Sequence, residues 1–506
     1  MVFRLLIAAA GILLLAQLCL LLVRYLRSPL KAVPGPFLAR ITNAWYFWAV
    51  KRGDFEVVNV ELHKKHGPIV RYGPNRYSIS NPEASRIIYG PGGNLAKSTW
   101  YLAWATPGQW TLFTDQHNAR HSKNRRLYQA MYSMSSLVHY ESYVDTCVDI
   151  FVQRLSEMAQ SSMPVNMGHW FQCYAFDVIG MITFAKRFGF LDRGEDVGGV
   201  IGALEDFLYY ASLTGIFPHL HPYLFYVRNL LAGAKGAARA YVMGFTSERM
   251  REHQVTPKAV QTGEDGPGIT EDFLTKFLNH NARDPDRFTT YHVLMACSQN
   301  VLAGSDTTAI SLSSILYHLL KYPECMKKLR DEIDQFAAEG ALSKMPTFKE
   351  ASQMPYFQAV IKEALRMHPA SGLPLERVVP EGGATIAGQY FPRGTIVGIN
   401  SWVEHRDARY FGPDTDTFRP ERWLDEDTDK LSIMNRHWMP FGLGPRTCIG
   451  RHISMLEMSK LIPLILRDFD FALDGPISQP WEAASYWFVK PKNFKVRITP
   501  RKVEKA

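Results

Sequence analysis

The sequence predicts a mainly helical protein with a small β region (an α+β fold), preceded by one N-terminal transmembrane helix. An uninterrupted apolar stretch runs from Leu5 to Val23, with Gln17 as its one polar residue. Beyond residue 82, apolar residues recur mainly at the three- and four-residue spacing of helices. The two-residue alternation of strands is confined to short segments near 69–80 and 380–400. These patterns favour one anchored, mostly helical body.

The composition is that of an ordinary folded protein. Its 506 residues are 46% hydrophobic and 21% charged, which excludes a disordered or collagen-like chain. The formal net charge is +9, to which Arg4, Arg24, Arg27 and Lys31 contribute. The remaining excess is too diffuse to indicate a nucleic-acid partner. The cysteines lack any short spacing, so the sequence predicts neither a disulfide framework nor a zinc site.

The apolar stretch has the dimensions of a membrane anchor. A helix over 5–23 would be about 28 Å long, close to the roughly 30 Å hydrocarbon core of a bilayer. A cleavable signal peptide, the alternative, has a shorter apolar stretch and a small-residue cleavage site. Because Arg24 and Arg27 follow, the positive-inside rule places the rest of the chain in the cytosol. The expected order is a lumenal N-terminus at 1–4, an anchor at 5–23, a Pro/Gly hinge at 24–36 and one domain at 37–506.

Short strands and long helices follow in order. A strand pair is expected at 69–72 and 77–80, joined by a Gly-Pro-Asn turn. Helices are expected through most of 82–250, then a Gly- and Pro-containing surface loop at 255–268. The longest helix is predicted over 290–320, where no proline occurs. A second clean helix has one apolar face, formed by Phe357, Val360, Ile361, Ala364 and Leu365, and Pro369 ends it.

Chemistry is concentrated first in the segment from Phe441 to Gly450, which holds Cys448 among the glycines Gly442, Gly444 and Gly450. Glycines permit a tight turn and a close approach to a flat ligand. The N–H groups of 449–451, at the start of a helix, favour a thiolate, and a thiolate can ligate haem iron. Arg446 can pair with a haem carboxylate, and Phe441 would shield the sulfur. The alternative is a buried cysteine in a glycine-rich turn.

The second motif interrupts the longest helix with residues that form helices poorly, at 303–308. Such a local conflict is typical of functional sites. Gly304 would let a planar cofactor lie against the helix, Thr307 supplies a hydroxyl donor, and Asp306 can relay protons. The alternative is a kink with a solvated aspartate.

The third motif combines Glu363 and Arg366, neighbours on one helix face, with Arg422 downstream. Charge networks of this kind more often fix geometry than perform chemistry. We therefore predict a structural role for these three residues rather than a catalytic one.

Further cations are candidates for binding haem propionates. His121 and Arg125 lie four residues apart on a predicted helix and can hold one propionate together, and Arg377 is a third candidate. The alternative for each is a solvated surface residue. A basic patch for an acidic redox partner is also expected, formed by Arg120, Lys123, Arg126, Arg436, Arg451 and His452.

These motifs, in this order and across essentially the whole chain, resemble those of the cytochrome P450 family. The likeness is greatest to microsomal enzymes of filamentous fungi, in the pisatin-demethylase-like group of secondary metabolism. One departure is Pro463, which is expected to kink the helix after Cys448.

The resemblance implies a haem-thiolate monooxygenase of the endoplasmic reticulum membrane with a single membrane span. Haem b would be the cofactor, with Cys448 as the axial iron ligand and Gly442 and Gly450 in its binding loop. Asp306 and Thr307 would direct protons to oxygen. Electrons would come from NADPH through NADPH–cytochrome P450 reductase, with cytochrome b5 as a second candidate donor.

The resemblance also implies a pocket for a lipophilic small molecule, lined by aromatic and apolar residues. These are Trp100, Trp104, Trp110, Phe207, Tyr209, Tyr210, Leu373 and Trp487. Core packing is the alternative explanation of these side chains. Two rival functions stay open: a haem-thiolate isomerase or dehydratase that needs no dioxygen, and a non-catalytic haem-binding membrane protein.

Overall fold

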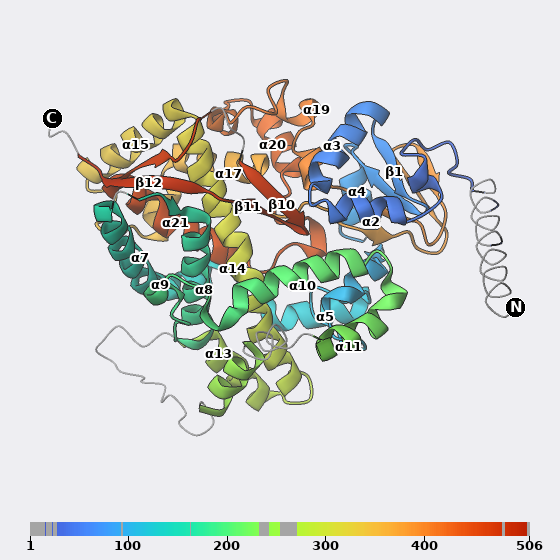
Figure 1. The fold of residues 1–506 in the computed structure, drawn as a ribbon, viewed down its shortest axis with the longest axis horizontal. Helices are drawn as coiled ribbons and strands as arrows, with labels where there is room; N and C mark the ends of the chain where they lie inside the picture. Colours follow the sequence, from blue (N-terminus) through green and yellow to red (C-terminus); the bar gives the residue numbers. More distant parts are fainter. Residues whose placement is uncertain are drawn as a thin grey trace, which may run out of the picture.

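Helices form most of the molecule, and a small β region lies on the side where the described chain begins (Figure 1). The structure is a computed structural model that describes residues 16, 23, 28–92, 95–161, 163–231, 242–252, 271–477 and 481–502. The predicted mainly helical fold with a small β part is confirmed. The predicted loop at 255–268 lies outside the described residues.

The largest sheet has the strand order β1-β2-β8-β5-β3. Its strands are β1 (Ile69–Gly73), β2 (Arg76–Ile79), β8 (Ile396–Gly398), β5 (Arg377–Val378) and β3 (Ala96–Lys97). The predicted strand pair is present, antiparallel, with Ile69 opposite Ile79. Lys97 pairs with Arg377, so strands distant in the sequence bring two cations together.

Smaller sheets lie outside this region. They are β6 (Ala384–Ile386) with β7 (Gln389–Phe391), β10 (Glu482–Tyr486) with β11 (Phe488–Lys492), and β4 (Val165–Asn166), β12 (Lys495–Pro500) and β9 (Phe469–Leu473) in the order β4-β12-β9. The alternating segment at 380–400 thus forms strands, as predicted.

The helices of the first half are mostly short. They are α2 (Ala44–Lys51), α3 (Phe55–His66), α4 (Ala84–Tyr89), α5 (Asn118–Gln129), α6 (Met134–Leu137), α7 (Glu141–Ser161), α8 (Met167–Phe184), α9 (Phe190–Arg193), α10 (Val200–Thr214) and α11 (His221–Leu231). Single 3-10 turns connect them: η1 (Leu38–Arg40), η2 (Thr99–Trp104), η3 (Val138–Tyr140), η4 (Val197–Gly199) and η5 (Pro218–Leu220).

The second half contains the helices that carry the predicted motifs. They are α13 (Phe273–Arg283), α14 (Thr290–Lys321), α15 (Pro323–Ala338), α16 (Phe348–Ser352), α17 (Pro355–Met367), α18 (Ser401–Glu404), α19 (Ala408–Phe411), α20 (Thr428–His437) and α21 (Arg451–Asp468), with the 3-10 turns η6 (Pro420–Leu424) and η7 (Gly444–Arg446). The helix α21 continues through Pro463 to Asp468.

The long helix α14 crosses the centre of the molecule (Figure 1). Its first turn is a capping box, in which Thr289 and the His292 side chain satisfy each other's backbone N–H groups. The hydroxyls of Ser305, Thr307 and Ser311 each donate to the carbonyl four residues earlier, so they do not break the helix. The predicted helix over 290–320 is confirmed, and the largest hydrophobic core forms around it with α7, α8, α17 and α21.

The predicted anchor at 5–23 lies outside the described residues except for Ala16 and Val23. Within the described ranges, no single helix is long and apolar enough to cross a membrane, and one pair bent by 120°, Val197–Thr214 with Pro218–Leu231, meets the length and composition test only jointly.

The described end of the hinge is docked on the sheet. Leu30 and Val33 are buried. The Arg71 side chain donates to the Leu30 carbonyl at 2.6 Å, and its backbone N–H donates to the Pro34 carbonyl at 2.8 Å. An added Cβ on Gly35 would lie 2.1 Å from the Arg71 carbonyl oxygen, so only glycine fits there.

Candidate functional site

The cysteine loop is a tight turn between the 3-10 turn η7 and α21. Gly442 and Gly444 have φ values of 68° and 67°, and an added Cβ on Gly444 would lie 1.7 Å from the Tyr89 carbonyl oxygen. The backbone N–H of Cys448 donates to the Phe441 carbonyl at 2.8 Å and closes the loop. Backbone conformation at both positions, and steric hindrance at Gly444, therefore favour glycine, in agreement with the tight turn that the sequence predicted.

The Cys448 thiol is accessible, whereas the other cysteines among the described residues are buried. Burial of the loop raises the pKa of this thiol. The N–H groups of Gly450 and Arg451, which hydrogen-bond to the sulfur, and the cations Arg125 and Arg451 act in the opposite direction. The loop thus offers donors and positive charge to a thiolate, and the exposure of Cys448 speaks against the alternative of a buried cysteine in a glycine-rich turn.

Four cationic side chains and the imidazole of His121, from four segments, face one another near this loop. They are Lys97, His121, Arg125, Arg377 and Arg446. Burial and then repulsion from Arg446 lower the pKa of His121 to about 3, and burial followed by Arg377 lowers the pKa of Arg446 to about 10. Such mutual repulsion marks an excess of positive charge that two carboxylates would neutralise.

Specific contacts hold these cations in place. Arg446 donates to the Asp115 carbonyl at 2.5 Å and to the Asn118 side chain at 2.8 Å. Arg377 donates to the Glu376 carbonyl at 2.9 Å and lies over the Tyr89 ring. The Asp115 carboxylate itself is engaged by Arg120. The accessible thiol, the glycine turn and the uncompensated cations together fit a flat, dianionic, thiolate-ligated group, which is the chemistry of haem b.

Lys97 is a site residue that the sequence analysis missed. It is buried, donates to the Phe113 carbonyl at 2.5 Å and lies over the Tyr101 and Phe113 rings. Its closeness to Arg377 depends on the pairing of β3 with β5, which a local pattern does not show.

The distal motif is part of a continuous helix, so the predicted alternative of a kink is wrong. Ala303 is exposed and Thr307 half-buried on one face of α14, with the Thr307 hydroxyl donating to the Ala303 carbonyl at 2.9 Å. An added Cβ on Gly304 would meet Ile179 of α8 at 3.3 Å. This glycine therefore makes room for α8 and not, as predicted, for a cofactor.

Asp306 is 1% exposed, so the alternative of a solvated aspartate is also wrong. Its Oδ1 atom accepts hydrogen bonds from Gln172 of α8 and, at 3.3 Å, from Lys490 of β11. Burial raises the pKa of this carboxyl, and Lys490 opposes that effect. An acid in this setting changes protonation more readily near neutral pH than an exposed one.

The Glu363 network is fully buried and linked to the cysteine loop. Glu363 accepts hydrogen bonds from Arg366 at 2.8 Å and from Arg422 at 2.9 Å. Arg366 donates to the His405 carbonyl, and the His405 ring accepts from the Met439 N–H at 2.8 Å, two residues before Phe441. Burial raises the pKa of Glu363, but the two guanidinium groups hold it below its usual value. This geometry supports the structural role predicted for the triad.

Some predicted pocket aromatics meet and others do not. Trp487 stands 5.0 to 6.0 Å from the rings of Trp100, Tyr101, Trp104 and Phe113. We call these five rings the aromatic cluster. Phe207 packs on Trp104, and Leu373 joins the same core.

Three predicted pocket residues pack elsewhere. Trp110 packs on Tyr291, Tyr209 packs on Tyr486, and the Tyr210 hydroxyl bonds to His221. For these three residues, packing or hydrogen bonding outside the aromatic cluster accounts for the presence of an aromatic side chain.

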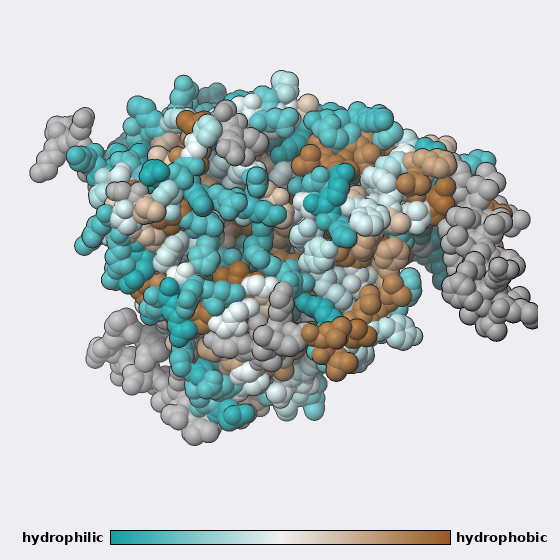
Figure 2. Space-filling view, in the orientation of Figure 1, coloured by the Kyte–Doolittle hydropathy of each residue, from teal (hydrophilic) through white to brown (hydrophobic). Residues whose placement is uncertain are grey.

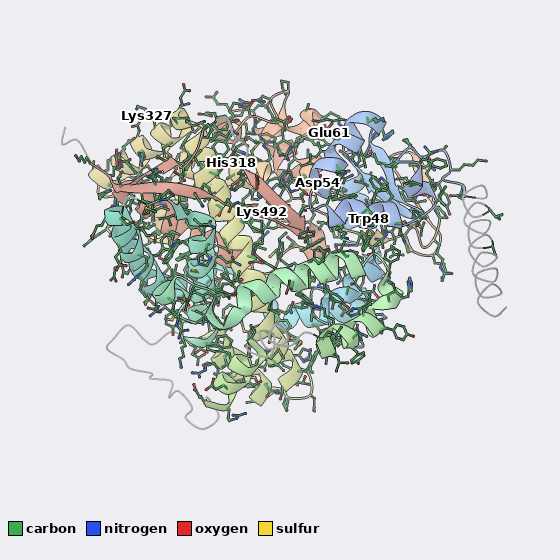
Figure 3. The ribbon with its side chains drawn as sticks, in the orientation of Figure 1. Trp48, Asp54, Glu61, His318, Lys327 and Lys492 are labelled. Carbon is green, nitrogen blue, oxygen red and sulfur yellow. The ribbon has the colours of Figure 1, made fainter. Side chains whose placement is uncertain are left out.

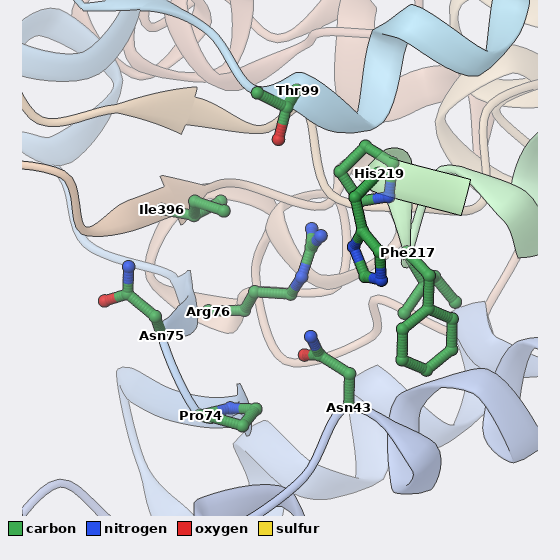
Figure 4. Close-up of a pocket in the computed structure, with 10 residues that line it drawn as sticks. Asn43, Pro74, Asn75, Arg76, Thr99, Phe217, His219 and Ile396 are labelled. Carbon is green, nitrogen blue, oxygen red and sulfur yellow. The ribbon is translucent and has the colours of Figure 1, made fainter. Parts of the chain in front are cut away.

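A separate cavity of about 240 Å³ opens between the β region and the loop after α10. Figure 4 shows Arg76 and His219 facing each other in it, with Asn43 beside them. Cys448, Asp306 and Thr307 are not among its lining residues.

Comparisons with known proteins agree with this geometry. The family model for cytochrome P450 matches residues 34–497. A pisatin demethylase of Fusarium vanettenii is 39% identical, covering 94% of this chain and 91% of the relative. A cytochrome P450 monooxygenase of Penicillium aethiopicum is 36% identical, with 94% of each chain covered. A crystal structure of a cytochrome P450 has a TM-score of 0.76 at 20% identity, covering 92% of this chain and 98% of that one.

Replacing Glu363 with Gln should destabilise the haem-loaded protein strongly, by about 3–5 kcal/mol, because the buried Arg366 loses its carboxylate partner and Arg422 keeps only Asp414. Thermal unfolding measures the loss. Because the pKa of Glu363 is lowered in the folded protein, its charge stabilises the fold fully above the usual carboxyl pKa. This contribution is lost as the pH falls through the lowered pKa. The difference between wild type and Glu363→Gln should therefore narrow in acid.

Glu421→Gln is the matched control, because Glu421 pairs with Lys328 at the surface. It should cost no more than about 1 kcal/mol. Equal losses in the two variants, or a Glu363→Gln deficit that does not change with pH, would contradict the assignment of the buried network.

Proposed function

Because this chain belongs to the cytochrome P450 family and is a haem b monooxygenase of that family, we propose that it takes electrons from NADPH through a membrane-bound reductase. With these electrons and dioxygen, it would oxidise a lipophilic small molecule of fungal secondary metabolism. The observation that carries this proposal is the accessible Cys448 thiol at the head of α21, next to a cluster of uncompensated cations.

The chain's own residues divide the work. Cys448 would hold the iron, and the cations Arg125, Arg377 and Arg446, with Lys97 and His121, would hold the propionates. Haem, when bound through a thiolate, supplies the activation of dioxygen. The Thr307 Oγ1 atom can donate its proton to a group on the accessible face of α14 once it leaves the Ala303 carbonyl. Asp306, one position earlier, can hold the next proton inside the protein.

The aromatic cluster supports a lipophilic aromatic substrate. Trp100, Tyr101 and Trp487 are buried rings, and stacked or edge-to-face contacts favour a flat apolar ligand. Two similar proteins are named pisatin demethylases, so an oxidation that removes a methyl group from an aromatic compound is the reaction class we propose first.

We also propose that the protein is a single-pass protein of the endoplasmic reticulum membrane with its domain in the cytosol. Besides the predicted anchor, an apolar patch supports this orientation. On α11 it consists of Tyr223, Leu224, Tyr226, Val227, Leu230 and Leu231, all exposed. Figure 2 shows this brown patch at the edge where α11 lies in Figure 1. Phe37, Leu38 and Trp48, near the start of the described chain, are further exposed apolar residues.

A reductase would dock on the predicted basic patch. Lys123 and Arg126 of α5, Arg436 of α20 and Arg451 of α21 are exposed, and Arg451 lies three residues after Cys448. Exposed cations steer an acidic partner toward the surface that carries them. Cytochrome b5 would suit the same surface.

The Cys448→Ser variant tests the haem-thiolate assignment. Wild-type protein, co-expressed with NADPH–cytochrome P450 reductase and reduced under carbon monoxide, should show the thiolate-type absorption band, and the variant should lose it entirely. The reason is that a hydroxyl does not replace a thiolate as an electron-donating ligand. A wild-type protein that never takes up haem, or a variant with an unchanged band, would refute the assignment.

The Thr307→Ala variant separates the monooxygenase from its rivals. It should keep haem but form at least about tenfold less product from pisatin, used as the probe, and release hydrogen peroxide instead, because a proton donor is lost. Ser311→Ala is the matched control, since the Ser311 hydroxyl also bonds along α14 but is buried one turn further on. A haem carrier would be indifferent to Thr307→Ala. An isomerase or dehydratase would turn over substrate without NADPH.

Membrane placement is tested in microsomes with the full chain. The protein should resist alkaline extraction, protease added from the cytosolic side should digest the domain, and a lipid-soluble photoreactive label should attach to α11. Leu424 and Ile433, exposed apolar residues near α20, should stay unlabelled as internal controls. Release by alkali, protection from the protease or labelling of the controls would contradict the proposed placement.

A further inference from the structure

Asp306 has a charge partner on a distant element, which the motif did not reveal. The Lys490 Nζ atom lies 3.3 Å from Asp306 Oδ1. Asp306 is on α14 and Lys490 on β11, so the pair joins two elements distant in the sequence. The Lys490 side chain is 18% exposed and the Asp306 side chain 1% exposed, so added salt screens this interaction little.

Lys490 is held by a second acid. Its Nζ atom lies 2.9 Å from Glu205 Oε1, and Glu205 belongs to α10 with a side chain 56% exposed. Burial raises the pKa of Asp306 most; Lys490 lowers it and Glu205 raises it, while Gln172 of α8 contributes an uncharged hydrogen bond. These groups from β11, α10 and α8 are the polar neighbours that set the state of this carboxyl.

The hairpin that carries Lys490 is fixed at its tip. Trp487 forms the turn between β10 and β11 with φ 74°, a conformation that costs a bulky residue energy unless its surroundings hold it. The Gly372 N–H donates to the Trp487 carbonyl at 2.8 Å, and the Ser485 N–H donates to the Gly53 carbonyl at 2.8 Å. Trp487 belongs to the aromatic cluster, so one hairpin contacts both that cluster and Asp306.

We propose that Lys490 is a positioning residue for proton delivery, which holds the Asp306 carboxylate from the hairpin that presents Trp487 to the aromatic cluster, and which Glu205 anchors from α10. The inference rests on the proposed function, because it assigns Asp306 to proton transfer. It adds that this acid's charge partner belongs to an element in contact with the proposed substrate pocket.

The two partners predict effects of opposite sign. Lys490→Met removes the cation and should move the pKa of Asp306 upward. Glu205→Gln removes a competing anion and should move it downward. A role in packing alone predicts no such opposition, since both variants would loosen the same contacts.

The experiment uses the full, haem-loaded chain with reductase and NADPH, and pisatin as the probe. The pH dependence of hydrogen peroxide released per NADPH oxidised is measured for wild type, Lys490→Met, Lys490→Arg and Glu205→Gln. This pH dependence should have a midpoint set by the titration of Asp306, and the Asp306→Asn variant identifies that midpoint because it should abolish it. The midpoint should rise in Lys490→Met, fall in Glu205→Gln and return toward wild type in Lys490→Arg. At neutral pH, Lys490→Met should release several-fold more peroxide per NADPH.

Lys492→Met is the matched control. Lys492 lies on the same strand, two residues further on, and is exposed (Figure 3). It should leave the profile unchanged. Shifts of the same sign in Lys490→Met and Glu205→Gln, no shift in either, or an equal effect of Lys492→Met would overturn the inference.

A second readout needs no catalysis. In thermal unfolding of the haem-loaded protein, a carboxyl whose folded pKa is raised destabilises the fold as pH increases through its range. The stability deficit of Lys490→Met should therefore grow with pH, and the double variant Lys490→Met/Asp306→Asn should lose that growth. If the double variant loses this pH dependence while wild type forms no product with any electron donor, the proposed function is refuted and the ion pair between Lys490 and Asp306 is supported. A pH-independent deficit that the second substitution leaves unchanged would refute the pair itself.

Discussion

The buried carboxylate of Glu363 pairs with two buried guanidinium groups, those of Arg366 and Arg422, and the proximal half of the structure depends on it; Asp414 is a second acid partner of Arg422. Arg366 and Arg422 are each at most 1% exposed, and a buried guanidinium group that loses a carboxylate partner destabilises the fold. Trp423 and the N–H of Arg419 also donate to Glu363. Through His405 and Met439 the same network reaches the residues that precede Phe441. A charge cluster with no chemical step of its own thereby sets where the sulfur of Cys448 lies.

Around that fixed loop the fold concentrates positive charge. Strand pairing brings Lys97 to Arg377, helix periodicity brings His121 to Arg125, and the turn at 115–118 holds Arg446. Their repulsion is unfavourable until carboxylates arrive, so binding of a dianion relieves a strain already present in the protein. Pre-organised cations also lose little freedom on binding, because backbone carbonyls fix three of them.

Contiguous motifs were predictable, and long-range neighbours were not. The loop at 441–450, the helix at 290–320 and the Glu363–Arg366 spacing are local patterns, and the structure contains all three. Lys97 and Lys490 acquire their partners only through sheet and hairpin geometry, which no spacing encodes. The sequence analysis placed Gly304 on the cofactor side of the helix. The side on which it lies depends on how α14 packs on α8, and the sequence does not show that packing. Trp110 and Tyr210 show that the segment in which an aromatic residue lies does not determine which part of the fold its side chain contacts.

The docked hinge has a mechanical consequence for the whole molecule. Because Arg71 binds the carbonyls of Leu30 and Pro34, and Val33 is buried between them, this segment runs in a fixed direction on the sheet. In the membrane placement proposed above, this fixed direction would restrict rotation of the domain about its tether, and the entropy of aligning α11 with a lipid surface would be lost once, during folding. Under that proposal, a few residues far from the sulfur would set the tilt of the domain on the membrane, and a looser attachment of this segment would allow many tilts with the same catalytic centre.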